Sequence, residues 1–204
     1  MTLQPIAVPD LIKDLPLSSD AETLVDFSND QIEAFMLADQ TIIENFVTCD
    51  FHLVAQALRW LQQEHLVAGN RFCEWGCGIG VVTMLAALQG MEAVGIEIEP
   101  RLVDLSTEIA QSKNVDAKFY CDSFVPRHSS KVSDLAAEVA NVVTDEGEVY
   151  EEIGLAIEDF DLFFAFPWPG EHHFFEAVFD DHASEGSLLL TYRGREGMNL
   201  VRKI

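Results

Sequence analysis

One glycine-rich stretch constrains the fold of this chain more than any other. Residues 71–75 can form a short strand, three glycines follow at alternate positions, and the apolar run 81–88 indicates a buried helix. A strand, a tight glycine turn and a helix form the nucleotide-binding corner of a doubly wound α/β sheet. Glycines let a ligand approach the main chain, and the helix amides beyond them favour a carboxylate or a phosphate. The stretch therefore predicts an α/β fold with a ligand site at this turn.

The spacing of these glycines narrows the class of ligand. The dinucleotide-binding fingerprint is G-x-G-x-x-G, which requires a small residue where Val81 stands. This chain has G-x-G-x-G instead, and Glu74 stands two residues before the first glycine. The next apolar run ends at Glu97. An acid at the end of the second strand of such a sheet can accept both ribose hydroxyls of a cofactor.

The segments EWGCGIG (74–80) and GIEIEP (95–100) resemble motifs I and II of the class I S-adenosylmethionine-dependent methyltransferases. The resemblance implies a Rossmann-like, mostly parallel sheet, S-adenosylmethionine as cofactor, and methyl transfer by direct displacement. It also implies an adenine contact by the Asp that ends the third strand, although a turn-forming Asp is the alternative there. The cofactor-binding residues implied by the resemblance are Glu74, Gly76, Cys77, Gly78, Gly80, Glu97, Ile98, Asp122, Ser123 and Phe166.

The end of the fourth strand is the expected acceptor site. The run FDLFFAF (160–166) is apolar on both faces, which is typical of a central parallel strand, and a PWPG turn follows it. In the class I methyltransferases this position carries motif IV. A Trp here can stack on a ring or surround a cation, and the two adjacent histidines can act as bases near neutrality. A structural turn and surface histidines are the alternative. The catalytic candidates are Pro167, Trp168, His172 and His173.

Motif IV of this chain matches neither of two known variants. The amino-methylating type, D/N-P-P-Y/F, needs an acid or an amide where Phe166 stands. The tRNA guanine-N7 methyltransferases carry F-P-D-P-W-P followed by basic residues, whereas Glu-His-His follows the turn here. The acceptor therefore cannot be inferred from this motif, and both departures argue against a nucleic acid.

The net charge of the chain also argues against a nucleic-acid partner. Its 12 Lys and Arg residues against 35 Asp and Glu residues give a net charge of −23 at pH 7. A field of that sign repels phosphate backbones, although solubility in an acid-rich proteome is the alternative explanation. We therefore expect a small-molecule or basic protein substrate and no nucleic-acid partner.

Composition also bears on compartment and metal content. No apolar run reaches the roughly 18 residues of a membrane span, and the chain does not open with a basic region and an apolar core. The four cysteines lack disulfide or zinc spacing. We therefore expect no metal and no membrane association, and a cytoplasmic protein.

We expect one domain over residues 1–204, with a helical N-terminal extension (1–66) and an α/β core (70–204). The first 30 residues or so lack periodicity and indicate an irregular arm. A helix is predicted from Asn29 or Asp30, with Phe46 in its apolar stripe.

A second helix is predicted from Thr48 or Asp50. Its start, at Asp50 and Phe51, is a secondary candidate for the cofactor site, with cap and core as the alternative.

The second half of the chain departs from the family pattern in two places. Residues 125–159 exceed a minimal crossover, and we expect one amphipathic helix at 132–139 followed by an acidic segment, either solvated or covering the substrate as a lid. The run from Met198 predicts a closing antiparallel strand. Because little chain remains beyond it, we expect a shortened C-terminal end and a sheet that lacks one strand.

The sequence thus predicts a methyltransferase that acts on a nitrogen or oxygen of a small molecule or protein. A non-catalytic binding or regulatory module with the same fold is the main alternative, because motif IV is unmatched and the C-terminal end is short. A tRNA guanine-N7-type methyltransferase and a nucleotide-dependent oxidoreductase are the others. Measuring which cofactor binds distinguishes the oxidoreductase from the methyltransferase, and measuring turnover distinguishes the non-catalytic module.

Overall fold

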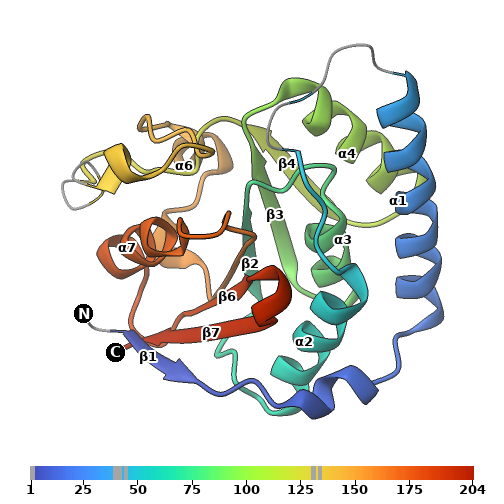
Figure 1. Cartoon of the computed structure of the whole chain (residues 1–204), viewed down its shortest axis with the longest axis horizontal. Coiled ribbons are helices and arrows are strands. Elements are labelled where there is room, and N and C mark those ends of the chain that lie inside the picture. The colour runs from blue at the N-terminus through green and yellow to red at the C-terminus, as the bar shows by residue number, and fades with distance from the viewer. Residues whose placement is uncertain (1–2, 39–42, 44–45, 130–131, 133–134) are drawn as a thin grey trace.

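The computed structural model describes residues 3–38, 43, 46–129, 132 and 135–204 (Figure 1). Its centre is a seven-stranded sheet in the order β1-β7-β6-β5-β2-β3-β4. Five neighbouring strands pair in parallel, and the remaining two form antiparallel pairs at one edge of the sheet. The expected doubly wound, mostly parallel fold is confirmed. The strands are β1 (Leu3–Ile6), β2 (Arg71–Trp75), β3 (Glu92–Glu97), β4 (Ala117–Cys121), β5 (Leu162–Ala165), β6 (Leu188–Tyr192) and β7 (Met198–Lys203).

Helices cover both faces of the sheet, so that two apolar cores form. Figure 1 shows α1 (Ser19–Ala38), α2 (Phe51–Gln63), α3 (Val81–Leu88) and α4 (Pro100–Lys113) on one side, and α6 (Val149–Ile153) and α7 (His172–His182) on the other. Successive strand residues point to opposite faces, so Phe72 packs in the first core and Trp75 in the second. Single 3-10 turns lie at Asp10–Asp14, Ala136–Glu138, Ile157–Asp159 and Gly194–Glu196.

Local sequence explains where several helices begin. The Leu53 amide donates to the Asp50 carboxylate at 3.0 Å, so α2 begins after the cap that the sequence offers. Pro100 occupies the first turn of α4, where its missing N–H costs no hydrogen bond. Gly80 precedes α3 with φ +73°, and a Cβ there would overlap the ring of Phe119. Only glycine fits that position.

The N-terminal arm is more regular than predicted, because it contains a strand as well as the short helical turn at Asp10–Asp14. Strand β1 pairs with β7, in a register from Leu3 opposite Lys203 to Ile6 opposite Leu200. Pro5 has no backbone N–H to donate to a neighbouring strand. An edge strand tolerates this, because it pairs on one side only. The sheet therefore does not lack a strand, because the arm supplies one, and residues 1–66 are not purely helical.

Helix α1 also begins earlier than predicted, at Ser19 rather than at residue 29 or 30. The Ala21 amide donates to the Ser18 hydroxyl at 3.2 Å, which is a cap that the periodicity did not reveal.

Within the described residues, no helix has both the length and the apolar character that a membrane crossing requires.

The long crossover between β4 and β5 packs onto the sheet. The hydroxyl of Tyr150 donates to the Phe124 carbonyl at 2.9 Å and accepts from the indole N–H of Trp75 at 3.1 Å. The amphipathic helix expected at 132–139 lies partly outside the described residues, and the described part contains the 3-10 turn at 136–138. Of the two alternatives for this segment, the solvated one does not hold around Tyr150, which packs on the sheet.

Candidate active site

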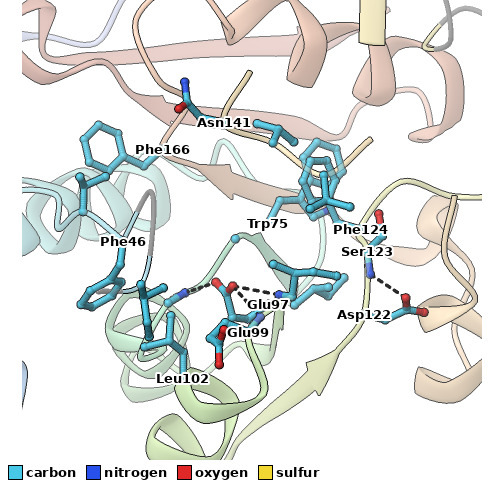
Figure 2. A pocket seen from close by; sticks show the side chains of 18 of the residues that line it. Phe46, Trp75, Glu97, Glu99, Leu102, Asp122, Ser123, Phe124, Asn141 and Phe166 are labelled. Carbon is cyan, nitrogen blue, oxygen red and sulfur yellow. Dashed lines mark hydrogen bonds between the residues drawn. The ribbon is translucent and has the colours of Figure 1, made fainter. Parts of the chain in front are cut away.

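A cavity of about 510 Å³ opens at the carboxyl ends of β2, β3, β4 and β5 (Figure 2). Ligands of open α/β sheets bind at this edge, and small-molecule sites measure roughly 300–1,000 Å³. Residues 76, 97, 122 and 166, which follow or end the four strands, all line the cavity. The cavity therefore joins the glycine turn to motif IV, as a donor and acceptor site requires.

The lining divides into two chemically distinct walls. Figure 2 shows Glu97 and Glu99 on one side of the cavity, with Phe166 and Asn141 across from them. By their chemistry, we call the charged, seryl and glycine lining residues the polar wall: Gly76, Gly78, Glu97, Glu99, Arg101, Asp122 and Ser123. We call a second group, of uncharged lining residues, the neutral wall: Trp75, Phe124, Asn141, Val142, Val143, Phe166, Trp168 and Phe175.

Glu97 fastens the glycine turn to the end of β3. One carboxylate oxygen accepts from the Gly78 amide at 2.8 Å, and the other accepts from the amides of Ile98 at 2.9 Å and Glu99 at 3.1 Å. A carboxylate offers about four lone-pair positions, so three hydrogen bonds leave it capacity for a ligand hydroxyl. Glu97 thus lies where the sequence predicts a ribose contact, which stays a prediction.

Glu74 supports the turn from below and does not line the main cavity. It accepts from the Thr83 amide at 2.7 Å and from the Thr83 hydroxyl at 2.5 Å, which ties β2 to the first turn of α3. Burial raises the pKa of Glu74 from 4.5 to about 8, against the two Thr83 hydrogen bonds, and the charge of Glu97 adds to the rise. Glu74 and Cys77 instead line a cavity of about 40 Å³ beside the turn, and Phe51 lines it too. Gly80 lines neither cavity.

Asp122 lines the polar wall, but it also builds a turn. One carboxylate oxygen accepts from the Ser123 amide at 2.7 Å, and the other accepts from the Glu148 amide at 2.8 Å. In Figure 2 the carboxylate lies at the margin of the cavity. The buried Ser123 hydroxyl accepts from the Val125 amide at 3.2 Å. The geometry thus supports the turn-forming alternative, and the adenine contact stays a prediction.

Phe46 covers the glycine turn, a role that its assignment to a helical stripe missed. Helix α1 ends at Ala38, and Phe46 lines both cavities. Gly78 has φ +55°, and a Cβ on it would lie 3.1 Å from the Phe46 ring. No sequence signal distinguishes Phe46 from a core residue.

The neutral wall is formed largely by aromatic rings from distant segments. The rings of Trp75 and Phe124 stack at 5.1 Å with 15° between their planes, and those of Phe124 and Phe175 stack at 5.3 Å with 18°. Phe166 packs against Tyr192 at 5.0 Å and lines both the main cavity and the small cavity beside the glycine turn. Trp168 lines the cavity as predicted, and the buried Pro167 does not.

The two candidate bases lie outside the cavity. His172 and His173 begin α7, with their rings 4.0 Å apart, and His173 Nδ1 lies 3.6 Å from the Glu176 carboxylate. Partial burial lowers the pKa of His172, and Arg193 and His173 add to this. Within the described residues, no histidine lines either cavity. A catalytic role for these histidines stays a prediction that the geometry does not support.

Glu171 is a buried residue that the sequence reasoning passed over. One of its carboxylate oxygens accepts from the Ala140 amide at 2.8 Å, and from the backbone and side-chain amides of Asn141 at 3.0 Å each. Its other oxygen has no hydrogen-bond partner within the described part of the chain. Glu171 therefore fastens the motif IV turn to the segment that forms the neutral wall. An acid just after a Pro-Gly turn was the only signal.

Comparison with known proteins identifies a family model and relatives that match this chain. A family model described as protein-L-isoaspartate(D-aspartate) O-methyltransferase (PCMT) matches residues 10–144. The ribosomal protein L11 methyltransferase of Ralstonia pickettii is 36% identical over 63 residues, which are 30% of this chain and 21% of that protein. A 23S rRNA (uracil(1939)-C(5))-methyltransferase of Shewanella amazonensis is 36% identical over 87 residues, 42% of this chain and 17% of that protein. The match thus spans about a fifth of either curated relative.

A solved structure shares the fold. A hypothetical protein of Thermus thermophilus superposes with a TM-score of 0.52 at 16% identity, over 82% of this chain and 94% of that one. At this identity the likeness concerns the fold alone.

The cavity fits S-adenosylmethionine. The glycine turn exposes main chain at Gly76 and Gly78, Glu97 keeps acceptor capacity, and the volume is that of a small-molecule site. Among the described residues, no group of three or more His, Cys, Asp or Glu could hold a metal. The matched family model covers the turn, the polar wall and part of the neutral wall. This chain belongs to the protein-L-isoaspartate(D-aspartate) O-methyltransferase (PCMT) family, and with it to the S-adenosylmethionine-dependent methyltransferases.

Proposed function

We propose that this protein transfers the methyl group of S-adenosylmethionine to a nitrogen or oxygen of a small molecule or a protein. One observation carries the proposal: Gly78 and Glu97 share a single cavity with Phe166 and Trp168. Donor and acceptor residues that line one cavity favour a direct displacement, because its two reactants must be aligned.

The chain supplies alignment and exclusion of water. The cofactor brings a methyl group on a sulfonium, which is already a good leaving group. The turn at Gly78 and the carboxylate of Glu97 would hold its ribose and amino acid portions. Phe166 and Trp168 would orient the acceptor by contact with their ring faces, and Val142 adds an apolar lining residue from the crossover.

We also propose that the acceptor is not a nucleic acid. The net charge is −23, and the only basic side chain among the described lining residues is Arg101, which pairs with Glu99 at 2.9 Å. Such a surface opposes phosphate binding. The relatives named above act, by their names, on a ribosomal protein and on 23S rRNA, so both classes belong in the test.

For this function we treat residues 1–204 as one domain. The first described strand, β1, pairs with the last, β7, so the extension 1–66 and the core 70–204 share one sheet. The α2 segment reaches the small cavity through Phe51. These contacts support a unit in which both parts are needed.

The test begins with titration calorimetry against S-adenosylmethionine, S-adenosylhomocysteine and NAD. We expect the first two to bind and NAD not to bind. Transfer of labelled methyl to small molecules, basic peptides and RNA then identifies the acceptor class. NAD binding alone would overturn the cofactor assignment. Salt-sensitive methylation of RNA would overturn the exclusion of nucleic acid, and tight cofactor binding without turnover on any class would favour the non-catalytic module.

A further inference from the structure

We propose that Asn141 binds the methyl acceptor, and that its side-chain oxygen accepts a hydrogen bond from an N–H group beside the methylated atom. The proposal rests on the proposed function and adds a specificity-determining residue to its site. It follows from the buried carboxylate of Glu171, which fixes the orientation of the Asn141 amide inside the cavity lining.

The Glu171 carboxylate decides which end of the Asn141 amide faces it. One of its oxygens lies 2.8 Å from the backbone amide of Ala140 and 3.0 Å from that of Asn141. A backbone amide can only donate, so this oxygen is a hydrogen-bond acceptor. The side-chain atom of Asn141 that lies 3.0 Å from the same oxygen is therefore the nitrogen, and the amide cannot be reversed.

The other end of this amide is the oxygen Oδ1, and it is left for a ligand. It accepts no hydrogen bond from the part of the chain that the structure describes, and the half-buried Asn141 lines the cavity. In Figure 2 the nitrogen of Asn141 is turned away from the other lining residues, and its oxygen lies on the side of Phe166. A ligand that displaces water from this oxygen has to replace the lost hydrogen bond, because an unpaired buried polar group is costly.

Glu171 also places Asn141 at the end of the cavity where the proposed function puts the methyl acceptor. The Glu171 backbone amide donates to the Trp168 carbonyl at 2.9 Å, which closes the turn after β5. Glu171 is 5% exposed, so it holds Trp168 through its backbone and Asn141 through its side chain from behind the surface. Both of these lining residues are therefore fixed relative to each other by one buried residue.

The group that suits the Asn141 oxygen is an N–H. An N–H group only donates, so it matches an oxygen that only accepts. A hydroxyl group also brings acceptor lone pairs, whereas the nitrogen end of Asn141 is directed at Glu171. An ester or ether oxygen in the same place would set two hydrogen-bond acceptors against each other. A site with a positioned polar group rejects an analogue that lacks the matching group.

N-methylbenzamide and methyl benzoate form a matched pair of probes, because the amide N–H of the first is replaced by an ester oxygen in the second. The affinity of each for the protein saturated with S-adenosylhomocysteine is measured by NMR titration. We expect the wild type to bind the amide at least about threefold tighter than the ester, which is the effect of one hydrogen bond.

The variant Asn141→Leu keeps the approximate size of the side chain and removes its oxygen. The two backbone hydrogen bonds to Glu171 do not depend on this side chain, so the segment stays fastened. We expect this variant to bind the two probes equally. Asn70→Leu is the matched control, because Asn70 also donates to a glutamate, Glu92, at 3.3 Å but lines neither cavity. The control should keep the preference of the wild type for the amide.

Two variants of Glu171 test its role as a positioning residue. Glu171→Gln keeps an oxygen for the same donors, so the preference for the amide should remain. Glu171→Leu removes that oxygen and allows the Asn141 amide to reverse, so the preference should fall although Asn141 is still present. Affinity for S-adenosylhomocysteine should stay within about threefold in both, which checks that the fold survives. If Glu171→Leu does not fold, Asn141→Leu and its control decide the proposal.

Three outcomes with S-adenosylhomocysteine bound would overturn the proposal and leave the proposed function standing. They are equal binding of the two probes by the wild type, no binding of either probe, and an unchanged preference in Asn141→Leu. A preference that survives in Glu171→Leu would refute the positioning role of Glu171. If S-adenosylhomocysteine does not bind to the wild type, the proposed function fails and this proposal fails with it.

Discussion

The polar wall and the neutral wall of the cavity are built in opposite ways. On the polar wall, carboxylates accept hydrogen bonds from nearby backbone amides: Glu97 from Gly78, Ile98 and Glu99. On the neutral wall the cavity surface is mostly aromatic and aliphatic, and the carboxylate that positions it, Glu171, is buried behind that surface.

This difference shows how one fold can keep a donor site and change an acceptor site. The polar wall follows the ends of β2, β3 and β4, and only Asp122 is also fastened to the crossover, through the Glu148 amide. The neutral wall depends on one side chain that reaches a segment about 30 residues away, as Glu171 reaches Asn141. A crossover of other length or sequence could replace it without disturbing the glycine turn.

The largest effect is expected from breaking the polar wall at the glycine turn. In Gly78→Leu a side chain would occupy the space that the cofactor needs, and it would press on Phe46. We expect affinity for S-adenosylhomocysteine to fall more than about 100-fold by calorimetry. Gly90→Leu is the matched control, because Gly90 also has positive φ, with nothing within 4 Å of an added Cβ. Equal losses in both variants would refute a site at Gly78.

On the neutral wall, a large effect on turnover is expected, with little effect on cofactor affinity. Trp168→Ala should lower kcat/KM at least about 30-fold, since the acceptor loses a ring that aligns it, while cofactor affinity stays within about threefold. Steady-state kinetics and calorimetry on the same preparation give both numbers. A parallel loss of cofactor affinity would show that the two walls do not have separate roles.

Two acids of the polar wall, Glu97 and Glu99, are candidates for binding the ribose. Two hydrogen bonds to a carboxylate are worth about 1.5–3 kcal/mol each before compensation, so Glu97→Ala should weaken the cofactor at least about tenfold. Glu99→Ala is the natural comparison, because Glu99 lines the same wall. A change below about twofold in Glu97→Ala, with a larger one in Glu99→Ala, would transfer the role to Glu99.

The smallest effect concerns stability beneath the polar wall. The pKa of Glu74 is raised from 4.5 to about 8, so the folded state keeps a proton that the unfolded state releases. The contribution of Glu74 to stability is therefore full below pH 4.5 and is lost as pH rises toward 8.

Glu74→Gln removes this titration and keeps an oxygen for Thr83. Urea denaturation between about pH 5 and pH 8 should show that stability relative to the variant falls by more than about 1 kcal/mol in the wild type. Identical pH profiles would contradict the raised pKa.

The sequence could predict what neighbouring residues determine. The strand, the glycine turn and Glu97 meet because parallel strands end at one edge, and Asp50 could be recognised as a cap from its position alone. The fold and the family follow from these local patterns. Trp168 was expected at the cavity for the same reason.

The features that could not be predicted depend on partners far away in the chain. Strand β1 is short, and only its pairing with β7 makes it a strand. Phe124 and Asn141 lie on the neutral wall because the crossover packs back against the sheet, which no periodicity reveals. The histidines have suitable chemistry for a base, but the start of α7 does not bring them to the cavity.

The register of β1 against β7 sets the order in which the sheet is completed. Leu3 lies opposite Lys203, so this pair cannot form until the last strand has been synthesised. Until β1 pairs with it, β7 has an open edge, which is the part of a sheet most prone to pairing with another chain. Contacts of such long sequence separation also form late, because most of the chain must be ordered before they close. Strand β1 is therefore among the last of the described strands to pair, although it precedes the others in the chain.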